Sequence, residues 1–452
     1  MSRELKTIIV FTALCLTNPL SSFAAQDLLA LYEQALTSDP ILKQAEANRL
    51  AVGEIENQSI ARLLPNVSLS ASHSRNRLYN KRFTFQGAGE QNFWNSGFEL
   101  TLTQPVFRWE DWVRLDQSAN QIAQAEAEYQ AEEQNLMVRV AEAYFNVLAA
   151  LDDLQFTQME KTAIGRQLEQ AQARFEVGLI AITDINEAQA AFDRASAEEI
   201  AAQNAVDNSK ERLREIVGDV VGDEFAILDS ELPLNRPDPS DIEAWGRLAE
   251  NQNLRIVASF NQAEVARKTI EVHQSGHYPS LDIVGAYSMT DNNSTFGLRG
   301  DQQRIGVELN IPLFAGGEVS SRIRQAQYQH EQAKEKLNET RRAVIRMTKD
   351  AYRGVLTSIS RVQALKTAVV SAESALEATD AGFEVGTRTM VDVLKSQRDL
   401  YQARRNWARS RYDYLINGLK LKQAASTLTA QDIAALNQLL RTNPPSTSQA
   451  TD

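Results

Sequence analysis

The stretch FEVGLIAITDINEA (residues 175–188) and its near copy FEVGTRTMVDVLKS (residues 383–396) decide the fold of this 452-residue chain. In both copies Val-Gly interrupts a long run of helix-forming residues, and a single Asp follows a few positions later. Glycine accepts the positive φ that a tight turn requires. The pattern therefore predicts two tips, each joining two long helices.

The repeat extends outward from the tips over most of the chain. Asp27–Pro65 aligns with Asp241–Pro279 without a gap, and AEAYFNVLAA (residues 141–150) stands opposite KDAYRGVLTS (residues 349–358). Each half reads as a helix, two strands, a long helix, a tip and a closing helix, which indicates an internal duplication. We predict a first repeat at 26–230, a proline-bearing linker at 231–240 and a second repeat at 241–441.

Four segments of about ten residues alternate apolar and polar side chains, with the period of a β-strand. Their apolar faces are Val67, Leu69 and Ala71; Trp94, Phe98, Leu100 and Leu102; Leu281, Ile283, Tyr287 and Met289; and Ile305, Val307, Leu309 and Ile311. This length and period are typical of outer-membrane barrel strands, although a soluble half-buried sheet would fit any one segment. We predict barrel segments at about 64–107 and 279–314, with outward loops near Arg75–Asn92 and Thr290–Gln303.

Four strands cannot close a barrel, because small barrels need about eight. An open sheet edge in lipid would leave backbone groups without hydrogen bonds. The chain must therefore combine with copies of itself. Three copies would supply twelve strands, but the pattern alone does not choose three.

The long helices set a second dimension. From Asp111 to Phe175 the chain has no Pro and a single Gly, Gly165. A continuous helix of this length would run roughly 100 Å at 1.5 Å per residue. Outside a membrane, such a helix belongs to a coiled coil or to the wall of a tube. A plain coiled-coil rod explains the helices but leaves the strands unexplained.

Composition narrows the class and the compartment. Asp plus Glu exceed Lys plus Arg by 59 to 47, a net charge of −12 that argues against nucleic acid as a partner. Residues 1–25 resemble a signal peptide, with basic residues before the apolar run IIVFTALCL and a cut after Ala24 or Ala25. Cys15 lies inside that run, so the mature chain has no disulfide or thiolate metal site. The tail at 442–452 reads as disordered.

Several long motifs resemble the outer membrane factor family, the trimeric outer-membrane channels of Gram-negative efflux and type I secretion. They are AYFNVLAALDDL, RFEVGLIAITDINEAQAAFD, VGTRTMVDVL and SRYDYLINGLKLKQA, and the similarity runs from about Gln26 to about Leu440. The resemblance implies a mainly α, α+β fold: a helical barrel in the periplasm and a homotrimeric twelve-stranded β-barrel in outer-membrane lipid. It also implies partners, namely a periplasmic adaptor and an inner-membrane pump of the RND, ABC or MFS type.

The resemblance assigns the gate of the periplasmic entrance to four residues. Thr183 and Asp184 follow the first tip, Phe383 precedes the second turn, and Arg388 lies just past it. An Arg388–Asp184 bridge between neighbouring coils would hold the tunnel closed. The family commonly has Tyr at position 383, so Phe383 removes one link. Helix capping is the alternative: Thr389 with Asp392, and Asp184 with Glu187, both have capping-box spacing.

The family constriction carries two acidic rings one helical turn apart. Asp392 keeps one of them, whereas Lys395 occupies the other. A ring that mixes Asp with Lys attracts cations less than an all-Asp ring, so we expect weaker block by multivalent cations.

The resemblance further assigns adaptor docking to the tip surface, at Val177, Gly178, Leu179, Val385 and Gly386. The simpler interpretation is that both glycines only permit the turn. The two interpretations are compatible.

Three rival functions remain at this point. A non-conducting periplasmic strut or adhesin stalk would keep the helices but fill the tube. An envelope enzyme lacks a catalytic constellation, and we find no phosphate-binding or dinucleotide motif that would indicate a cofactor. A metal-export channel lacks Met/His/Cys clusters, and we expect no metal at His273 and His277, where the helix is ending. We predict a passive exit duct that is not an enzyme.

Overall fold

The computed structural model describes residues 26–80, 89–219, 221–222, 224–229, 231–294 and 297–441. The predicted signal peptide and the predicted disordered tail lie outside these residues. The boundaries of the two repeats stay a prediction.

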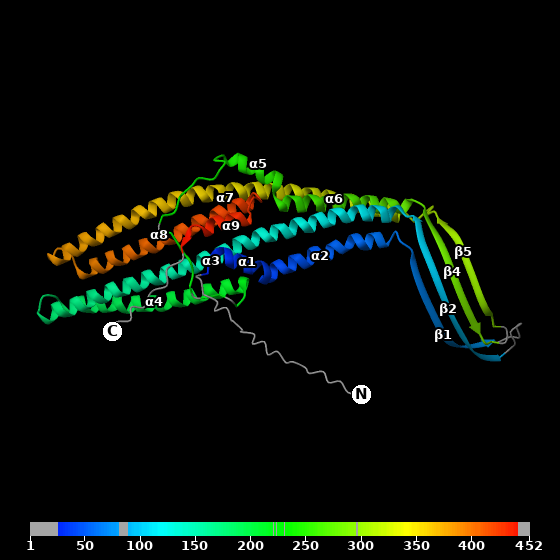
Figure 1. Ribbon diagram of the computed structural model, residues 1–452, viewed down its shortest axis with the longest axis horizontal. Coiled ribbons are helices and arrows are strands. Elements are labelled where there is room, and N and C mark those ends of the chain that lie inside the picture. Colours follow the sequence, from blue (N-terminus) through cyan, green and yellow to red (C-terminus); the bar gives the residue numbers. More distant parts are fainter. Residues whose placement is uncertain are drawn as a thin grey trace, which may run out of the picture.

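Helices dominate the described residues. They are α1 (Leu28–Ser38), α2 (Pro40–Ala61), α3 (Trp109–Glu176), α4 (Ile182–Val217), α5 (Ile242–Gln252), α6 (Leu254–Gln274), the 3-10 turn η1 (Ser275–His277), α7 (Glu318–Glu384), α8 (Met390–Ala424) and α9 (Ala430–Asn437). The predicted long helix is confirmed, because α3 runs unbroken for 68 residues and its counterpart α7 for 67. At 1.5 Å per residue each spans roughly 100 Å. Figure 1 shows both running along the long axis, with the strands at one end and the tips at the other.

Shorter helices fill the length of each long one by stacking end to end. Asn253 Nδ2 at the start of α6 donates to the Ala424 carbonyl at the end of α8, at 2.9 Å. At the matching place in the first half, Gln34 of α1 donates to the Val217 carbonyl that ends α4, at 3.2 Å. Each such bond satisfies a helix-end carbonyl that has no partner within its own helix.

The four predicted strands form one antiparallel sheet in the order β1-β2-β4-β5. The strands are β1 (Asn66–Asn80), β2 (Gly89–Phe107), β4 (Ser280–Asn292) and β5 (Arg299–Asn310). Their polar outer ends continue the ladder, with Tyr79 opposite Glu90 and Asp291 opposite Arg299. The predicted loops at 75–92 and 290–303 were therefore too long, since backbone pairing does not need the apolar alternation to continue.

One face of the sheet is apolar and open. Leu100 of β2 lies opposite Leu69 on one side and Tyr287 on the other, so these side chains share a face. Leu69 is 69% exposed and Ile305 of β5 is 84% exposed. Ser70, Glu99 and Ser288 share the opposite face. A bare apolar face of this extent requires lipid or another apolar surface.

The main hydrophobic core sits at mid-length, where α1 and α9 pack against α3 and the end of α8. Tyr144 and Phe145 of α3 are fully buried there, and the Tyr144 hydroxyl donates to the Ala226 carbonyl at 2.7 Å. A two-stranded sheet joins β3 (Ile227–Leu228) to β6 (Leu440–Arg441) beside this core. We did not predict this sheet, because strands of two residues carry no periodicity. None of the helices among the described residues is long and apolar enough to cross a membrane.

Candidate functional site: the paired helical tips

The two tips have the same backbone geometry. At the first, the Leu179 N–H donates to Arg174 O at 2.9 Å and the Gly178 N–H to Phe175 O at 2.8 Å. At the second, the Thr387 N–H donates to Gly382 O at 2.8 Å and the Gly386 N–H to Phe383 O at 3.1 Å. Both are Schellman motifs, which satisfy carbonyls at the end of a helix.

Backbone conformation explains the glycine at each turn. Gly178 has φ 76° and Gly386 has φ 79°. A Cβ added at either position would meet nothing within 4 Å, so space is not the constraint. Side chains with a Cβ are strained at such φ values, which confirms the turn interpretation.

The tip surface presents apolar side chains to solvent. Val177 is 69% exposed, Leu179 is 73% exposed and Val385 is 75% exposed. The structure thus places the predicted docking residues together with Gly178 and Gly386 at the exposed ends of the two hairpins (Figure 1).

The predicted gate residues lie at the tips, and within the part of the chain that the structure describes no ion pair joins Asp184 to Arg388. Thr183 and Asp184 occupy the first turn of α4, and Arg388 lies in the turn before α8. Among the described residues neither Asp184 nor Arg388 has a side-chain ion pair. The predicted bridge is therefore not made within one chain among the described residues.

Capping explains one tip and not the other. At the second, the Asp392 carboxylate accepts from the Thr389 N–H at 3.0 Å and from its hydroxyl at 2.9 Å, and a capping box is present. At the first, Ala181 is the N-cap and makes no side-chain bond. The Asp184–Glu187 capping box was therefore wrong, because α4 begins two residues before Asp184. The Asp184 carboxylate still benefits from the positive end of the helix dipole.

The two predicted constriction residues differ in their contacts within the chain. The hydrogen bonds from Thr389 hold the pKa of Asp392 below its ordinary value, and the charges of Arg388 and Lys395 add to that effect. Lys395 is exposed and one turn further along α8. Asp392 thus carries its negative charge throughout the neutral pH range, next to a cation.

Phe383 joins the two tips of the chain. Its ring is half-buried against a cluster formed by Ile164, Leu168, Ala188 and Met390, among others. The Arg174 guanidinium lies over the ring, 5.0 Å from its centroid. We did not predict a role for Arg174. The only hint in the sequence is a difference between the two repeats: Arg174 stands before Phe175, whereas Gly382 stands before Phe383.

Gly382 makes room for Arg388, the predicted gate arginine. A Cβ added at Gly382 would lie 2.7 Å from the Arg388 Cγ. The Arg388 N–H also donates to the Gly382 carbonyl at 3.2 Å. The missing side chain at 382 therefore lets the Arg388 stem lie against the end of α7.

Buried ionic groups tie the two coils together above the tips. Glu160 of α3, 2% exposed, accepts from Arg405 Nη1 of α8 at 2.8 Å. Burial raises the pKa of Glu160 and Arg405 opposes that rise. One further tie is the Tyr412 hydroxyl, which donates to Asp152 at 2.7 Å. Burial also raises the pKa of Asp152. These contacts hold α3 and α8 in register.

The described residues contain no group of three or more His, Cys, Asp or Glu side chains suited to a metal ion.

The chain matches a family model described as outer membrane efflux protein over residues 31–219 and 245–427. It is 38% identical to the outer membrane protein TolC of Vibrio cholerae, over 96% of this chain and 99% of that protein. Against TolC of Escherichia coli K12 the identity is 36%, over 99% and 92% of the two chains. It is 25% identical to the proteases secretion protein PrtF of Dickeya chrysanthemi, over 97% and 96%.

Solved structures share the fold at lower identity. The Campylobacter jejuni CmeC outer membrane channel superimposes with a TM-score of 0.76 at 15% identity, covering 92% of this chain and 90% of that one.

Proposed function

The chain belongs to the outer membrane efflux protein family and forms an exit channel in the outer membrane for efflux and type I secretion, and we propose that it works as a homotrimer gated at its periplasmic tips. We therefore favour a channel over the alternative function, a non-conducting stalk. The chain is a passive duct, and the energy for transport comes from its partners.

The free edges of the sheet carry the trimer proposal. Within the described residues β1 pairs only with β2, and β5 pairs only with β4. The two edge strands are antiparallel to each other, so β5 of one copy can pair with β1 of the next in the same alternating sense as the rest of the sheet. Head-to-tail pairing of this kind closes a ring, and three copies give a barrel of about twelve strands.

The helices leave free flanks on the same two sides. Within one chain α3 contacts α2 and α4 on one side, while α6 and α8 lie between α3 and α7. The outer flanks are thus α2 with α4 on one side and α7 on the other. The sheet and the helices can therefore close around one common axis.

The two tips supply the gate. Asp184 and Arg388 carry opposite charges that form no ion pair with any described residue of their own chain, so each is available to a neighbouring coil. A bidentate guanidinium–carboxylate pair orients its partners as well as attracting them. One exposed pair contributes only ~0–1 kcal/mol, but symmetry would repeat it around the entrance. Thr183 beside Asp184 can donate a further bond to the same link, while Phe383 cannot.

The exposed apolar tips favour docking of a periplasmic adaptor protein. Val177, Leu179 and Val385 are exposed apolar side chains beside the turns at Gly178 and Gly386. Because glycine has no side chain, another helical hairpin can approach the backbone closely there. An inner-membrane pump of the RND, ABC or MFS type would couple through that adaptor.

Single-channel conductance in a planar lipid bilayer tests the proposal. The mature protein should show small, steady openings, and Arg388→Ala should enlarge them because the entrance loses its link. Arg361→Ala, an exposed arginine on α7 away from the tip, is the matched control and should leave conductance unchanged. Inserted protein without conductance would support the stalk, and conductance that ignores Arg388→Ala would place the gate elsewhere.

A further inference from the structure

The two halves of the chain differ at one matched helix junction. Aligning Tyr144 of α3 with Tyr352 of α7 places Arg139 opposite Met347. In the first half, the Arg139 guanidinium donates two hydrogen bonds to Asp39, at 2.9 and 3.0 Å, where α2 begins. Asp39 is 1% exposed, so this pair fills the interior of the junction.

The second half keeps the junction and loses the pair. Asn253, at the start of α6, stands where Asp39 stands in the first half, and Met347 cannot pair with it. Asn253 instead caps α6 through the Arg255 N–H and bonds the end of α8. A cavity of about 410 Å³ remains where the ion pair would be.

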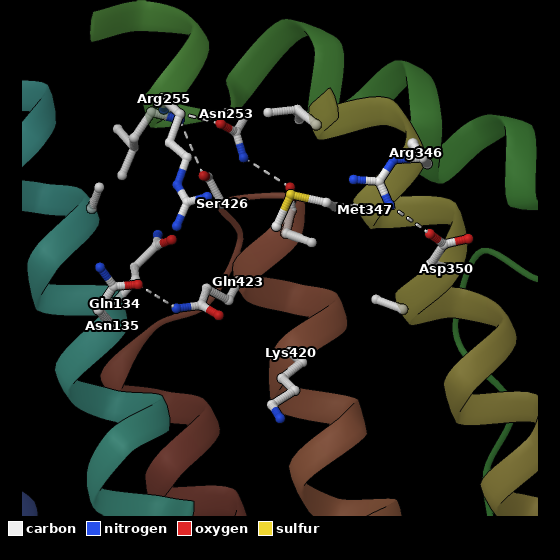
Figure 2. A pocket seen from close by; sticks show the side chains of 15 residues that line it. Gln134, Asn135, Asn253, Arg255, Arg346, Met347, Asp350, Lys420, Gln423 and Ser426 are labelled. Atoms are coloured by element: carbon white, nitrogen blue, oxygen red, sulfur yellow. Dashed lines mark hydrogen bonds and ion pairs between the residues drawn. The ribbon is translucent and has the colours of Figure 1, made fainter. Parts of the chain in front are cut away.

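The cavity combines an apolar wall with a cationic rim (Figure 2). Its apolar side chains come from four helices, α3, α6, α7 and α8: Ala131, Leu254, Val344, Met347, Ala351 and Ala424. Among its cations, Arg346 bonds Asp350 at 3.2 Å and Lys420 pairs with Glu142 of α3. Arg255 has no side-chain ion pair within the described residues, and its guanidinium extends toward Gln134 (Figure 2).

The cavity lies on the side of α7 opposite to the short helix α5. Lys349 of α7 bonds Glu243 of α5 at 2.7 Å. Met347 and Ala351 lie two residues to either side of Lys349, roughly 200° around the helix, and so point the opposite way. Because α5 must lie outside an open tube, the cavity opens toward its interior. The α6–α8 stack lies between α3 and α7 of the same chain, so a neighbouring copy does not cover it.

We propose that this junction cavity binds a small organic anion with an apolar body, its carboxylate held by Arg255 and its apolar part by Met347, Val344 and Ala351. A planar guanidinium donates two parallel bonds to a carboxylate, which supplies the polar contact. The cavity volume falls within the range of small-molecule pockets. The inference rests on the proposed channel only for the direction in which the cavity faces.

Isothermal titration calorimetry of the mature trimer in phosphatidylcholine nanodiscs tests this, with 2-naphthoate as the probe. The expected result is one site per chain, with the uncharged isostere 2-naphthamide binding at least about tenfold more weakly because it cannot form the charged pair. Arg255→Gln should weaken naphthoate to a similar extent. Arg247→Gln, an exposed α5 arginine paired with Asp241, is the matched control and should bind as the wild type does.

A second variant tests the position of the site. Asn253→Asp combined with Met347→Arg rebuilds the ion pair of the first half and should fill the cavity. Naphthoate binding should disappear while the trimer melts at or above the wild-type temperature. The proposal is overturned by wild-type protein that binds no naphthoate, by equal binding of amide and carboxylate, or by the filled variant binding normally. Because calorimetry needs no conduction, lost binding with normal conductance overturns this inference alone, and absent conductance with intact binding overturns the channel alone.

Discussion

The Arg174 guanidinium lies 5.0 Å from the centroid of the Phe383 ring, which joins the end of α3 to the end of α7 within one chain. A cation over an aromatic ring contributes about 0.5–1 kcal/mol at an exposed site. This contact links the two tips of one chain. Phe383 stands where the family commonly has a tyrosine, whose hydroxyl is expected to form a gate link.

Restoring that hydroxyl should tighten the entrance. In Phe383→Tyr the ring can still lie under Arg174, and the new hydroxyl can donate to the Asp184 carboxylate of a neighbouring coil. We expect smaller or rarer single-channel openings than in the wild type. Combining the change with Asp184→Asn should return the openings to those of Asp184→Asn alone. A Phe383→Tyr channel that conducts as the wild type does would show that the hydroxyl reaches no partner.

Removing the tip glycines should loosen the turns. Gly178→Ala and Gly386→Ala place a Cβ on a left-handed backbone, at a cost of about 1–2 kcal/mol each. Hydrogen exchange should then be about tenfold faster at the Leu179 amide in the first variant and at the Thr387 amide in the second. Gly53→Ala is the matched control. It lies inside α2, where a Cβ meets nothing within 4 Å and φ is not positive, so it should not slow or speed exchange at the tips. Unchanged exchange in the tip variants would mean that the turns tolerate the strain by shifting.

Charge at the constriction should set the block by multivalent cations. Lys395→Asp converts the mixed ring into a doubly acidic one, so a trivalent cation should block the variant at lower concentration than the wild type. The pKa of Asp392 is held below its ordinary value, so block should be constant with pH near neutrality and weaken only in acid, as that carboxylate is protonated. Lys395→Gln should fall between the two. Equal block of wild type and Lys395→Asp in bilayer recordings would contradict this assignment.

The buried Glu160–Arg405 pair predicts a pH dependence of stability. Burial raises the folded-state pKa of Glu160 above its ordinary value of 4.5, so the folded state holds the proton more tightly than the unfolded state. The stabilisation from that proton is complete below the ordinary pKa and is lost as pH rises through the raised folded pKa. Glutamine does not titrate, so the Glu160→Gln variant does not lose this stability as the pH rises. Its melting temperature relative to the wild type should therefore rise from about pH 4 to pH 7.

The exposed pair Arg404–Glu373 offers the control for that measurement. Glu373 is 45% exposed, and Glu373→Gln should shift the melting temperature little at any of these pH values. Arg405→Gln leaves Glu160 buried without its partner and should lower the free energy of unfolding by about 3–5 kcal/mol. A difference between Glu160→Gln and wild type that does not change with pH would contradict the raised pKa.

The residue patterns of the strands and helices predicted most of the fold. The alternation at Leu69, Leu100, Tyr287 and Ile305 predicted four strands, and their register places all four side chains on one face. The strand ends were missed because polar residues such as Tyr79 and Glu90 pair through backbone bonds that leave no pattern in the side chains. The short β3–β6 sheet was missed because strands of two residues carry no periodicity.

At the tips, the sequence predicted interactions between residues close together in the chain better than interactions between different helices. Thr389 and Asp392 lie three residues apart and form the capping box that their spacing indicates. The same spacing at Asp184 and Glu187 failed, since α4 already begins at Ile182, with Ala181 as its N-cap. Arg174 and Phe383 lie on different helices, and their contact depends on the crossing of α3 with the α7–α8 coil.

The sequence by itself determined the duplication, the glycine turns and the apolar strand faces, because each rests on residues near one another along the chain. The tertiary structure alone decided the contact of Arg174 with Phe383, the room that Gly382 leaves for Arg388, and the cavity beside Met347. These depend on which side chains distant helices bring together, and volume and pairing at a helix junction are properties of that packing.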